Sequence, residues 1–227
     1  MSEPLAERLK SETHELHRAA ERSAFMSALL SGRLERGAYA LMLRSLHEIY
    51  AALEAGLDAH PGHPQLARVW CPALARRAAL ERDLCGLAGK AWATELDAQP
   101  AAQQHARHLR QLARETPAAL LGHAYVRYLG DLSGGQLLAP IVERSLQLPA
   151  GDATRFYDFG GVSLAAQRGR DFRDGLAAID DRGRLADMLV AEARLAFGLH
   201  LRLFDELALA ADLARPQPSD ASPRSRA

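Results

Sequence analysis

Hydrophobic residues recur every three or four positions along most of this 227-residue chain, the spacing that places them on one face of a helix. Leu5, Leu9, Leu16 and Ala20 follow this spacing, and Pro4 suits a first helical turn. The pattern therefore predicts a first helix over residues 4–30, ended by Gly32. A second helix is predicted over residues 36–57, where the prolines of the HPGHP segment end it.

Further helical patterns fill the rest of the chain. Short helices are predicted near residues 65–70, 74–88 and 100–113, and residues 117–147 are helical on both sides of Gly134 and Gly135. Two adjacent glycines disfavour a straight helix, so we expect a kink there. Residues 148–162 are predicted to be a loop, 163–178 a short helix and 182–213 a long amphipathic helix.

Composition settles the fold class that this pattern suggests. Only 12 of the 227 residues are Val, Ile or Thr, whereas Ala, Leu, Arg, Glu and Gln dominate. These abundant types favour helices, and strands prefer the β-branched residues that are scarce here. The sequence therefore predicts one all-α domain over residues 1–213. Residues 214–227, rich in Pro, Ser and Arg, are predicted to be a disordered tail.

Charge and cysteine content narrow the class of protein. Lys plus Arg equals Asp plus Glu at 28 each, so no overall charge draws the chain to nucleic acid or anionic membrane. Cys71 and Cys85 form no CxxC pair, and two cysteines make no disulfide framework for this length. The first ten residues mix acidic and basic side chains without an apolar run, which is unlike a signal peptide or anchor. We expect a cytoplasmic protein.

Two of the nine histidines, His14 and His17, lie three residues apart on the predicted first helix. Lys10 precedes His17 by two turns, about 10 Å along the axis and on nearly the same face. Glu21 follows His17 at i+4, where its carboxylate can orient the imidazole as a metal ligand. The spacing leaves open a metal pair, a single ligand with a nearby anion site, and an ordinary surface. His105 and His108, in a polar QQHARH stretch, are interpreted as solvent-exposed.

The segment HAYVRYLGDLSGGQLL, residues 123–138, is the second unusual feature. Gly130 and Gly134 fall about 40° apart on a helical wheel, with Arg127 and Asp131 beside them. Glycines on one helix face let the backbone come very close to a flat ligand, although they also permit close packing against another helix.

At these residues the sequence resembles the haem oxygenase family. RYLGDLSGGQ is similar to the family's signature, and LKSETHELHRAAERSAFM resembles the first-helix segment that supplies the proximal histidine. The similarity continues through SLHEIYAALE to EARLAFGLHLRLFDEL, so it spans residues 9–207. The resemblance implies a multi-helix bundle in which the helix with the glycines covers the distal side of haem.

The resemblance also implies roles for individual residues. His17 corresponds to the axial ligand of the haem iron, and Glu21 to its hydrogen-bonding partner. Asp131 corresponds to the distal carboxylate that holds the catalytic water network, together with Arg127 and Tyr50. Further positions that match the family face the haem or its propionates: Lys10, Tyr125, Gly130, Gly134, Arg173, Phe197 and Phe204. At the position of a family propionate lysine this chain has Gly169, and Arg168 or Arg170 is expected to substitute.

The implied reaction consumes O2 and reducing electrons and cleaves haem at a meso carbon, expected to be α, to biliverdin, Fe2+ and CO. Haem would be both substrate and cofactor. No flavin or dinucleotide motif is present, so electrons are expected from a partner reductase or ferredoxin, and the protein is expected to act as a monomer. Two alternatives remain: a non-catalytic haem-binding or haem-transfer protein, and the related all-α thiamin-degrading hydrolases, which need a nucleophilic cysteine.

Overall fold

The computed structural model describes residues 4–179 and 183–213, and within them the chain is helical and contains no strand. The helices, in chain order, are α1 Leu5–Glu21, α2 Ala24–Leu30, α3 Arg36–Asp58, α4 Arg77–Ala88, α5 Trp92–Glu95, α6 Pro100–Glu115, α7 Leu120–Ser145, α8 Val162–Ala177 and α9 Arg184–Ala210. The predicted all-α fold is therefore confirmed over these residues. The predicted tail at 214–227 lies outside them.

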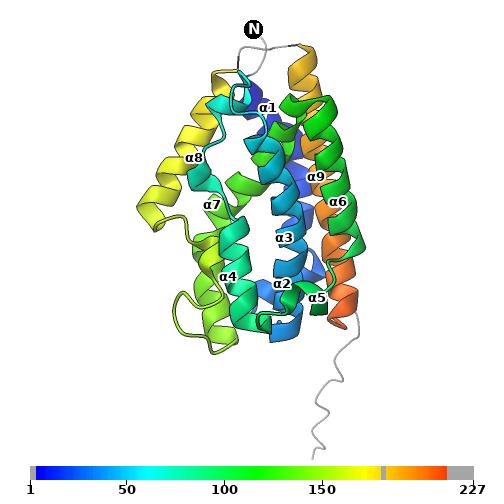
Figure 1. The fold of residues 1–227 in the computed structure, drawn as a ribbon, viewed down its shortest axis with the longest axis vertical. Helices are drawn as coiled ribbons and strands as arrows, with labels where there is room; N and C mark the ends of the chain where they lie inside the picture. The colour runs from blue at the N-terminus through cyan, green and yellow to red at the C-terminus, as the bar shows by residue number, and fades with distance from the viewer. Residues whose placement is uncertain (1–3, 180–182, 214–227) are drawn as a thin grey trace, which may run out of the picture.

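The helices pack around a central α3 (Figure 1). In this view α6 and α9 lie to its right, while α4 and α8 lie to its left and α7 passes behind. α3 packs most extensively against α6, and α9 packs against both α1 and α7. The apolar faces anticipated from the sequence meet inside, where Leu9, Leu43, Leu53 and Leu109 are fully buried. Burial of such faces is the main source of helix stability in a bundle.

The prediction of one helix over residues 4–30 is wrong. The chain turns at Arg22 and Ser23, which separate α1 from α2. The hydroxyl of Ser23 accepts a hydrogen bond from the backbone N–H of Met26, so Ser23 is the N-cap of the new helix. This break lets α2 pack against α9 and α7 instead of continuing along the axis of α1.

The long helix α7 runs without interruption from Leu120 through Gly134 and Gly135 to Ser145. The kink expected at the two glycines stays a prediction. Near its start α7 lies very close to α9, because a Cβ placed on Gly122 would be 2.7 Å from the backbone oxygen of Leu189. Any larger residue at 122 would push the two helices apart.

The loop predicted at residues 148–162 is present and contains one 3-10 turn, Arg155–Tyr157, which packs against α4 and α7. None of the helices in the described ranges is both long enough and apolar enough to span a bilayer.

Candidate active site

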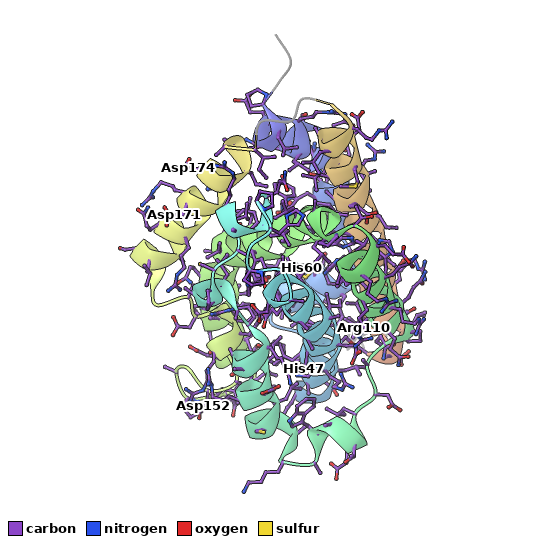
Figure 2. The ribbon with its side chains drawn as sticks, turned by 45° about the horizontal axis from the view of Figure 1, so that its top comes forward. His47, His60, Arg110, Asp152, Asp171 and Asp174 are labelled. Carbon is purple, nitrogen blue, oxygen red and sulfur yellow. The ribbon has the colours of Figure 1, made fainter. Side chains whose placement is uncertain are left out.

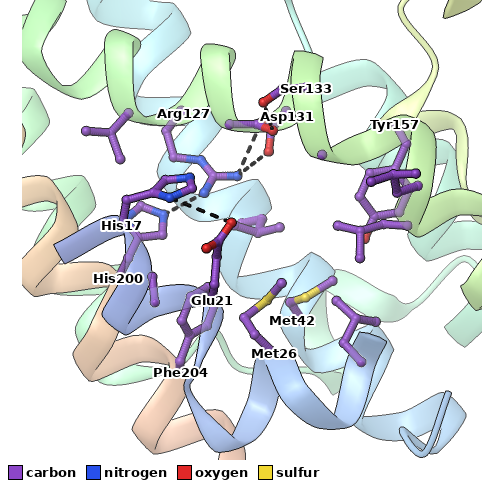
Figure 3. Close-up of a pocket in the computed structure, with 18 of the residues that line it drawn as sticks. His17, Glu21, Met26, Met42, Arg127, Asp131, Ser133, Tyr157, His200 and Phe204 are labelled. Carbon is purple, nitrogen blue, oxygen red and sulfur yellow. Dashed lines mark hydrogen bonds and ion pairs between the residues drawn. The ribbon is translucent and has the colours of Figure 1, made fainter. Parts of the chain in front are cut away.

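A cavity of about 360 Å³ opens between α1, α2, α3, α7, α9 and the 3-10 turn at Arg155–Tyr157 (Figure 3). Most of its wall is apolar. The lining residues are His17, Ala20, Glu21, Met26, Leu29, Met42, Leu46, Val126, Arg127, Gly130, Asp131, Ser133, Gly134, Leu137, Leu138, Phe156, Tyr157, Phe197, His200 and Phe204. Both unusual segments of the sequence, on α1 and on α7, therefore meet at one cavity.

His17 and Glu21 project from α1 into this cavity (Figure 3). The Nδ1 atom of His17 lies 3.7 Å from a carboxylate oxygen of Glu21, and the imidazole packs edge-on against Phe197, with ring centroids 5.9 Å apart. About half of the His17 side chain is exposed, which leaves it accessible to a ligand in the cavity. His14 is exposed and lies outside the lining, so the structure does not form the His14–His17 metal pair.

Across the cavity, α7 presents backbone in place of side chains at two positions. A Cβ placed on Gly130 or Gly134 would meet no heavy atom of the protein within 4 Å. Close packing within the protein therefore does not explain these two glycines. Gly135 differs, because its Cβ would lie 3.2 Å from the side chain of Tyr157. Of the three neighbouring glycines, one serves helix packing and two line open space.

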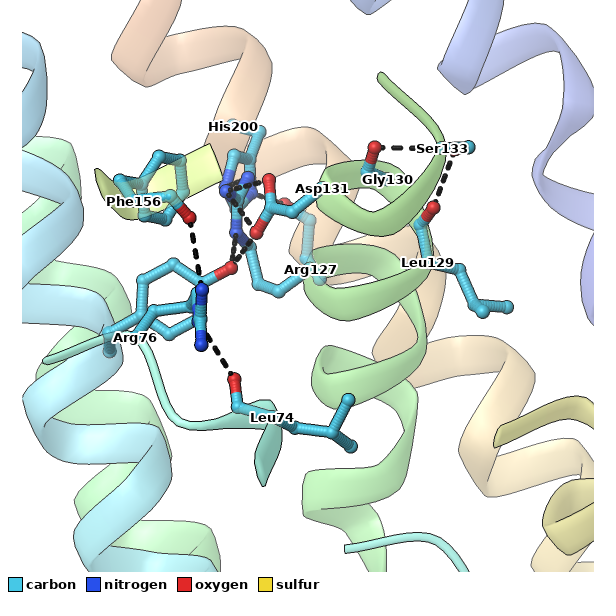
Figure 4. A network of polar contacts seen from close by, with 11 residues as sticks. Leu74, Arg76, Arg127, Leu129, Gly130, Asp131, Ser133, Phe156 and His200 are labelled. Carbon is cyan, nitrogen blue, oxygen red and sulfur yellow. Dashed lines mark hydrogen bonds and ion pairs between the residues drawn. The ribbon is translucent and has the colours of Figure 1, made fainter. Parts of the chain in front are cut away.

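The polar group of the cavity is the ion pair between Arg127 and Asp131 of α7 (Figure 4). Arg127 donates from Nη2 to a carboxylate oxygen of Asp131 at 2.9 Å, and from Nε to the Tyr50 hydroxyl at 3.3 Å. The Tyr50 hydroxyl in turn donates to Asp131. Tyr50 is fully buried in α3 and lies outside the lining. The structure thus brings together all three residues of the predicted distal network.

Burial raises the pKa of Asp131, and the positive charge of Arg127 offsets only part of that effect. Burial likewise raises the pKa of Tyr50 well above its ordinary value, so this hydroxyl remains a proton donor. A carboxylate with a raised pKa at the edge of a cavity is a group suited to passing protons to bound water.

Sequence reasoning missed His200 on α9. It is buried, it lines the cavity, and its Nε2 atom accepts a hydrogen bond from Arg127 Nη1 at 2.8 Å. Its Nδ1–H donates to the backbone oxygen of Ala196. Burial and the charge of Arg127 lower the pKa of His200 to about 3, so the ring is neutral and holds the guanidinium toward Asp131. In the sequence, its position in the apolar repeat of α9 was the one indication that His200 is buried.

The residues predicted to face propionates lie outside the cavity lining. Lys10 is exposed on α1, and Tyr125 of α7 is half-buried beside Thr13 and Arg173. Arg173 donates to the backbone oxygen of Gly169, one turn earlier in α8. These side chains come from α1, α7 and α8, and α8 packs against both of the other two helices. Their predicted role in binding a carboxylate stays a prediction.

Two arginines were expected to replace the family lysine at Gly169. Arg168 donates to the backbone oxygen of Phe159, and Arg170 donates to Gln167 at 2.6 Å. Arg168 is held against the protein, whereas Arg170 is exposed. Gly169 itself is buried, and a Cβ there would contact Arg173 at 3.4 Å.

The prediction that His105 and His108 are both solvent-exposed is wrong for His105. Its side chain is 1% exposed and its Nε2 lies 2.8 Å from His123 Nδ1. The strongly amphipathic α6 turns this position toward α7 and α9, and the polar neighbours in the sequence face solvent. His108 is partly exposed and contacts Glu192.

The cavity meets the requirements of a flat macrocycle with a central metal. One wall offers an accessible imidazole that has a carboxylate partner, and the opposite wall offers bare backbone where a side chain at 130 or 134 would occupy the open space. Phe197 adds aromatic surface beside the imidazole, and Phe204 adds it elsewhere in the lining. An accessible imidazole such as that of His17 is a ligand that a haem iron accepts.

The sequence and the fold are both similar to those of known proteins. The family model described as Heme oxygenase matches residues 3–206. Heme oxygenase 1 of Homo sapiens is 36% identical over 91% of this chain and 73% of its own length. Heme oxygenase 1 of the cyanobacterium Nostoc is 32% identical over 91% of this chain and 87% of its own.

Solved structures of cyanobacterial proteins superpose closely. Heme oxygenase-1 from Synechocystis in complex with heme has a TM-score of 0.86 at 31% identity, covering 92% of this chain and 95% of that one. Heme oxygenase-2 from Synechocystis in complex with heme and NO has a TM-score of 0.89 at 32% identity, covering 93% and 88%. Because the family model spans nearly all of the sequence and the fold agrees, the chain belongs to the haem oxygenase family.

Proposed function

We propose that this protein cleaves haem oxidatively in the cavity between α1 and α7 and releases biliverdin, Fe2+ and CO. The observation that carries this proposal is the placement of His17 across the cavity from Gly130 and Gly134, with Asp131 on the same wall as the glycines. A bound haem would be the substrate as well as the group that activates O2. The meso carbon that we propose is attacked is the α carbon.

On the proximal side, His17 would hold the iron through Nε2. Its Nδ1 atom lies toward Glu21, so an Nδ1–H tautomer leaves Nε2 free to bind metal. Phe197 packs edge-on against the imidazole and limits its rotation. Phe204 stacks on Phe25, with ring centroids 6.1 Å apart, and forms a rigid part of the wall.

On the distal side, Asp131 would order water at the cavity and transfer protons to it. Arg127 and the Tyr50 hydroxyl fix both carboxylate oxygens, and His200 fixes Arg127. The carboxylate is thereby positioned for water-mediated proton transfer. Gly130 and Gly134 would leave room above the ring for O2, which a side chain at either position would take up.

Outside the cavity lining, Lys10, Tyr125 and Arg173 would bind the two carboxylates of haem. Lys10 and Arg173 are exposed and positively charged, and the Tyr125 hydroxyl lies between the elements that carry them. Arg170 is exposed and donates to the neutral amide oxygen of Gln167, so it is better placed than Arg168 to supply a further positive charge. Charge-assisted hydrogen bonds of this type to its two carboxylates would orient the haem.

The electrons would come from a separate protein, a reductase or ferredoxin, since the sequence has no flavin or dinucleotide motif. We propose that the protein works as a monomer in the cytoplasm. The two free, exposed thiols of Cys71 and Cys85 support a reducing compartment. Neither cysteine lines the cavity, which argues against a role as its nucleophile.

A haem-binding or haem-transfer protein without turnover is the alternative. Such a protein needs His17 and an apolar cavity, but it has no use for Asp131 fixed by the buried side chains of Arg127 and Tyr50. Titration with haem followed by ascorbate in air separates the two. An enzyme binds one haem and then loses the Soret band while bilin absorption grows, whereas a passive binder keeps a stable ferrous or oxygenated spectrum.

A further inference from the structure

A second group of metal-binding side chains lies on the side of α7 that faces α6 and α9. His108 of α6 and His123 of α7 both contact Glu192 of α9, at 2.7 and 2.8 Å between Nε2 and the same carboxylate oxygen. One donor atom from each residue lies within 4.8 Å of the other two. None of the three lines the haem cavity.

The backbone holds two of these residues together firmly. Gly122, next to His123, lies so close to α9 that a Cβ there would be 2.8 Å from the Cβ of Glu192. His123 is completely buried, so its imidazole has a fixed position. Preorganised donors bind a metal ion with less loss of side-chain entropy than mobile surface donors.

The group also has access to solvent. The side chains of His108 and Glu192 are 26% and 17% exposed, whereas His123 is 0% exposed. An ion would therefore enter beside His108 and keep a coordination position open to water. Three protein ligands and one position open to water are the common arrangement of catalytic zinc sites.

We propose that His108, His123 and Glu192 bind a divalent first-row transition-metal ion, with Zn2+ as the cation that suits them best. Two imidazole nitrogens and one carboxylate oxygen are a donor set that Zn2+ accepts in tetrahedral geometry. Bonds of about 2.0–2.1 Å place neighbouring donors about 3.3 Å apart. The observed pairs at 2.7 and 2.8 Å must open by about half an ångström, and partly exposed His108 is free to move.

The surroundings of His123 support this assignment. Its Nδ1 atom lies 2.8 Å from Nε2 of buried His105, so an Nδ1–H tautomer donates to His105 and presents Nε2 to the metal. Such a hydrogen bond behind a ligating imidazole fixes its orientation. The Nδ1 atom of His105 has no hydrogen-bond partner among the described residues, so this pair contains one unsatisfied nitrogen with either tautomer.

Metal binding at this group would join α6, α7 and α9 at a point one helical turn before Arg127. The site would thus stabilise the helix that carries the distal residues, without touching haem. Its existence does not depend on turnover, so the proposal and the proposed function fail independently.

The test is calorimetric titration of the full-length, haem-free chain with Zn2+ in a non-chelating buffer at pH 7.5. We expect a binding event that is weakened at least tenfold by His108→Ala and by Glu192→Gln. Glu192→Gln keeps a hydrogen-bond acceptor for both histidines but removes the charge, and His108→Ala alters a partly exposed position, so we expect both variants to fold. Circular dichroism verifies the fold of each.

The matched control is His47→Ala. His47 on α3, labelled in Figure 2, also contacts a glutamate, with its Nε2 3.3 Å from Glu81. Within residues 4–179 and 183–213, this pair is not part of a three-residue donor group. Zn2+ should raise the thermal unfolding midpoint of the wild type and of His47→Ala, and leave His108→Ala unchanged. The proposal would be overturned if the wild type bound no Zn2+. It would also be overturned if His108→Ala and Glu192→Gln both had the Zn2+ affinity and the midpoint shift of the wild type.

Discussion

Arg127 and Asp131, one turn apart on α7, form an ion pair with 2.9 Å between Nη2 and Oδ1, and only about a tenth of either side chain is exposed. An exposed i,i+4 pair of this kind contributes little to stability. Here the pair is continued on both sides, since Tyr50 donates to Asp131 and His200 accepts from Arg127. The pair therefore fixes the carboxylate at the cavity.

Replacing this carboxylate should separate binding from catalysis. In Asp131→Ala we expect haem affinity to stay within a few-fold of wild type, because His17 and the apolar wall remain. Biliverdin formation should fall by about 100-fold, a typical loss when a group that transfers protons is removed. Rates are measured as bilin absorbance after reduction in air.

The matched control for that variant is Ser133→Ala. Ser133 also lines the cavity, but its hydroxyl donates back to the backbone oxygen of Leu129 at 2.6 Å in its own helix. Its removal should leave turnover unchanged. If Asp131→Ala formed biliverdin at the wild-type rate, the Arg127–Asp131 pair would have a structural role only.

Alanine substitutions at Gly130 and Gly135 of α7 should have opposite effects on stability. Gly130→Ala places its Cβ in open space, so the haem-free protein should gain up to about 1 kcal/mol from helix propensity. Gly135→Ala brings its Cβ to 3.2 Å from Tyr157 and should destabilise the protein. Urea denaturation of both variants measures this difference.

The effects on haem turnover should be the reverse of those on stability: a substitution at Gly130 should lower turnover, and one at Gly135 should not. The larger substitution Gly130→Leu fills the open space beside α7 where we propose that haem binds, so turnover should fall more than haem affinity. A folded Gly135→Ala should retain activity. Wild-type turnover by Gly130→Leu would show that this face of α7 does not approach haem.

The proximal ligand gives a spectroscopic prediction. His17→Ala should fold normally, because His17 is about half exposed and contributes little packing. Its haem complex should lose the spectrum of histidine-ligated iron, and added imidazole should restore it. His14→Ala, exposed on the same helix, should behave as wild type. A histidine-type spectrum in His17→Ala would assign the ligand to another residue.

The buried histidine behind the distal network predicts a dependence of stability on pH. In the folded protein the pKa of His200 is about 3, whereas an unfolded histidine has a pKa near 6.5. Below pH 6.5 the unfolded chain takes up a proton that the folded chain does not. Stability is therefore lost as pH falls from 6.5, by up to about 1.4 kcal/mol per pH unit from this residue.

His200→Gln removes this proton uptake and keeps an acceptor for Arg127. Its free energy of unfolding should fall less steeply than that of wild type between pH 6.5 and 4.5. Burial also lowers the pKa of His105 and His123, so both proteins retain a slope in the same direction. Parallel pH profiles for the two proteins would mean that His200 is protonated in the folded state.

The sequence predicted those features that depend on order along one helix. His17 with Glu21, and Arg127 with Asp131, are i,i+4 pairs, so their meeting follows from helix geometry alone. Their positions on opposite walls of one cavity came from the family resemblance. His200 was missed because it reaches Arg127 across two helices, 73 residues apart in sequence, and its neighbours in α9 form an ordinary amphipathic pattern.

The two wrong predictions, one helix over residues 4–30 and an exposed His105, each have a physical cause. The break between α1 and α2 depends on one capping hydroxyl, that of Ser23, within an otherwise helical pattern. The burial of His105 depends on which face of α6 meets α7 and α9, and the polar residues around it hid this in the sequence. The first error therefore has a local cause, the capping hydrogen bond, whereas the second depends on a tertiary contact.

The central claim is that haem is consumed in this cavity by its own activation of O2. The most direct measurement is the CO and biliverdin released from one equivalent of haem bound to the full chain, with reductant, air and catalase present. The account predicts one CO and one biliverdin per haem, with both products greatly reduced in Asp131→Ala. Haem that stays intact, or that bleaches without CO while catalase removes free peroxide, would contradict it.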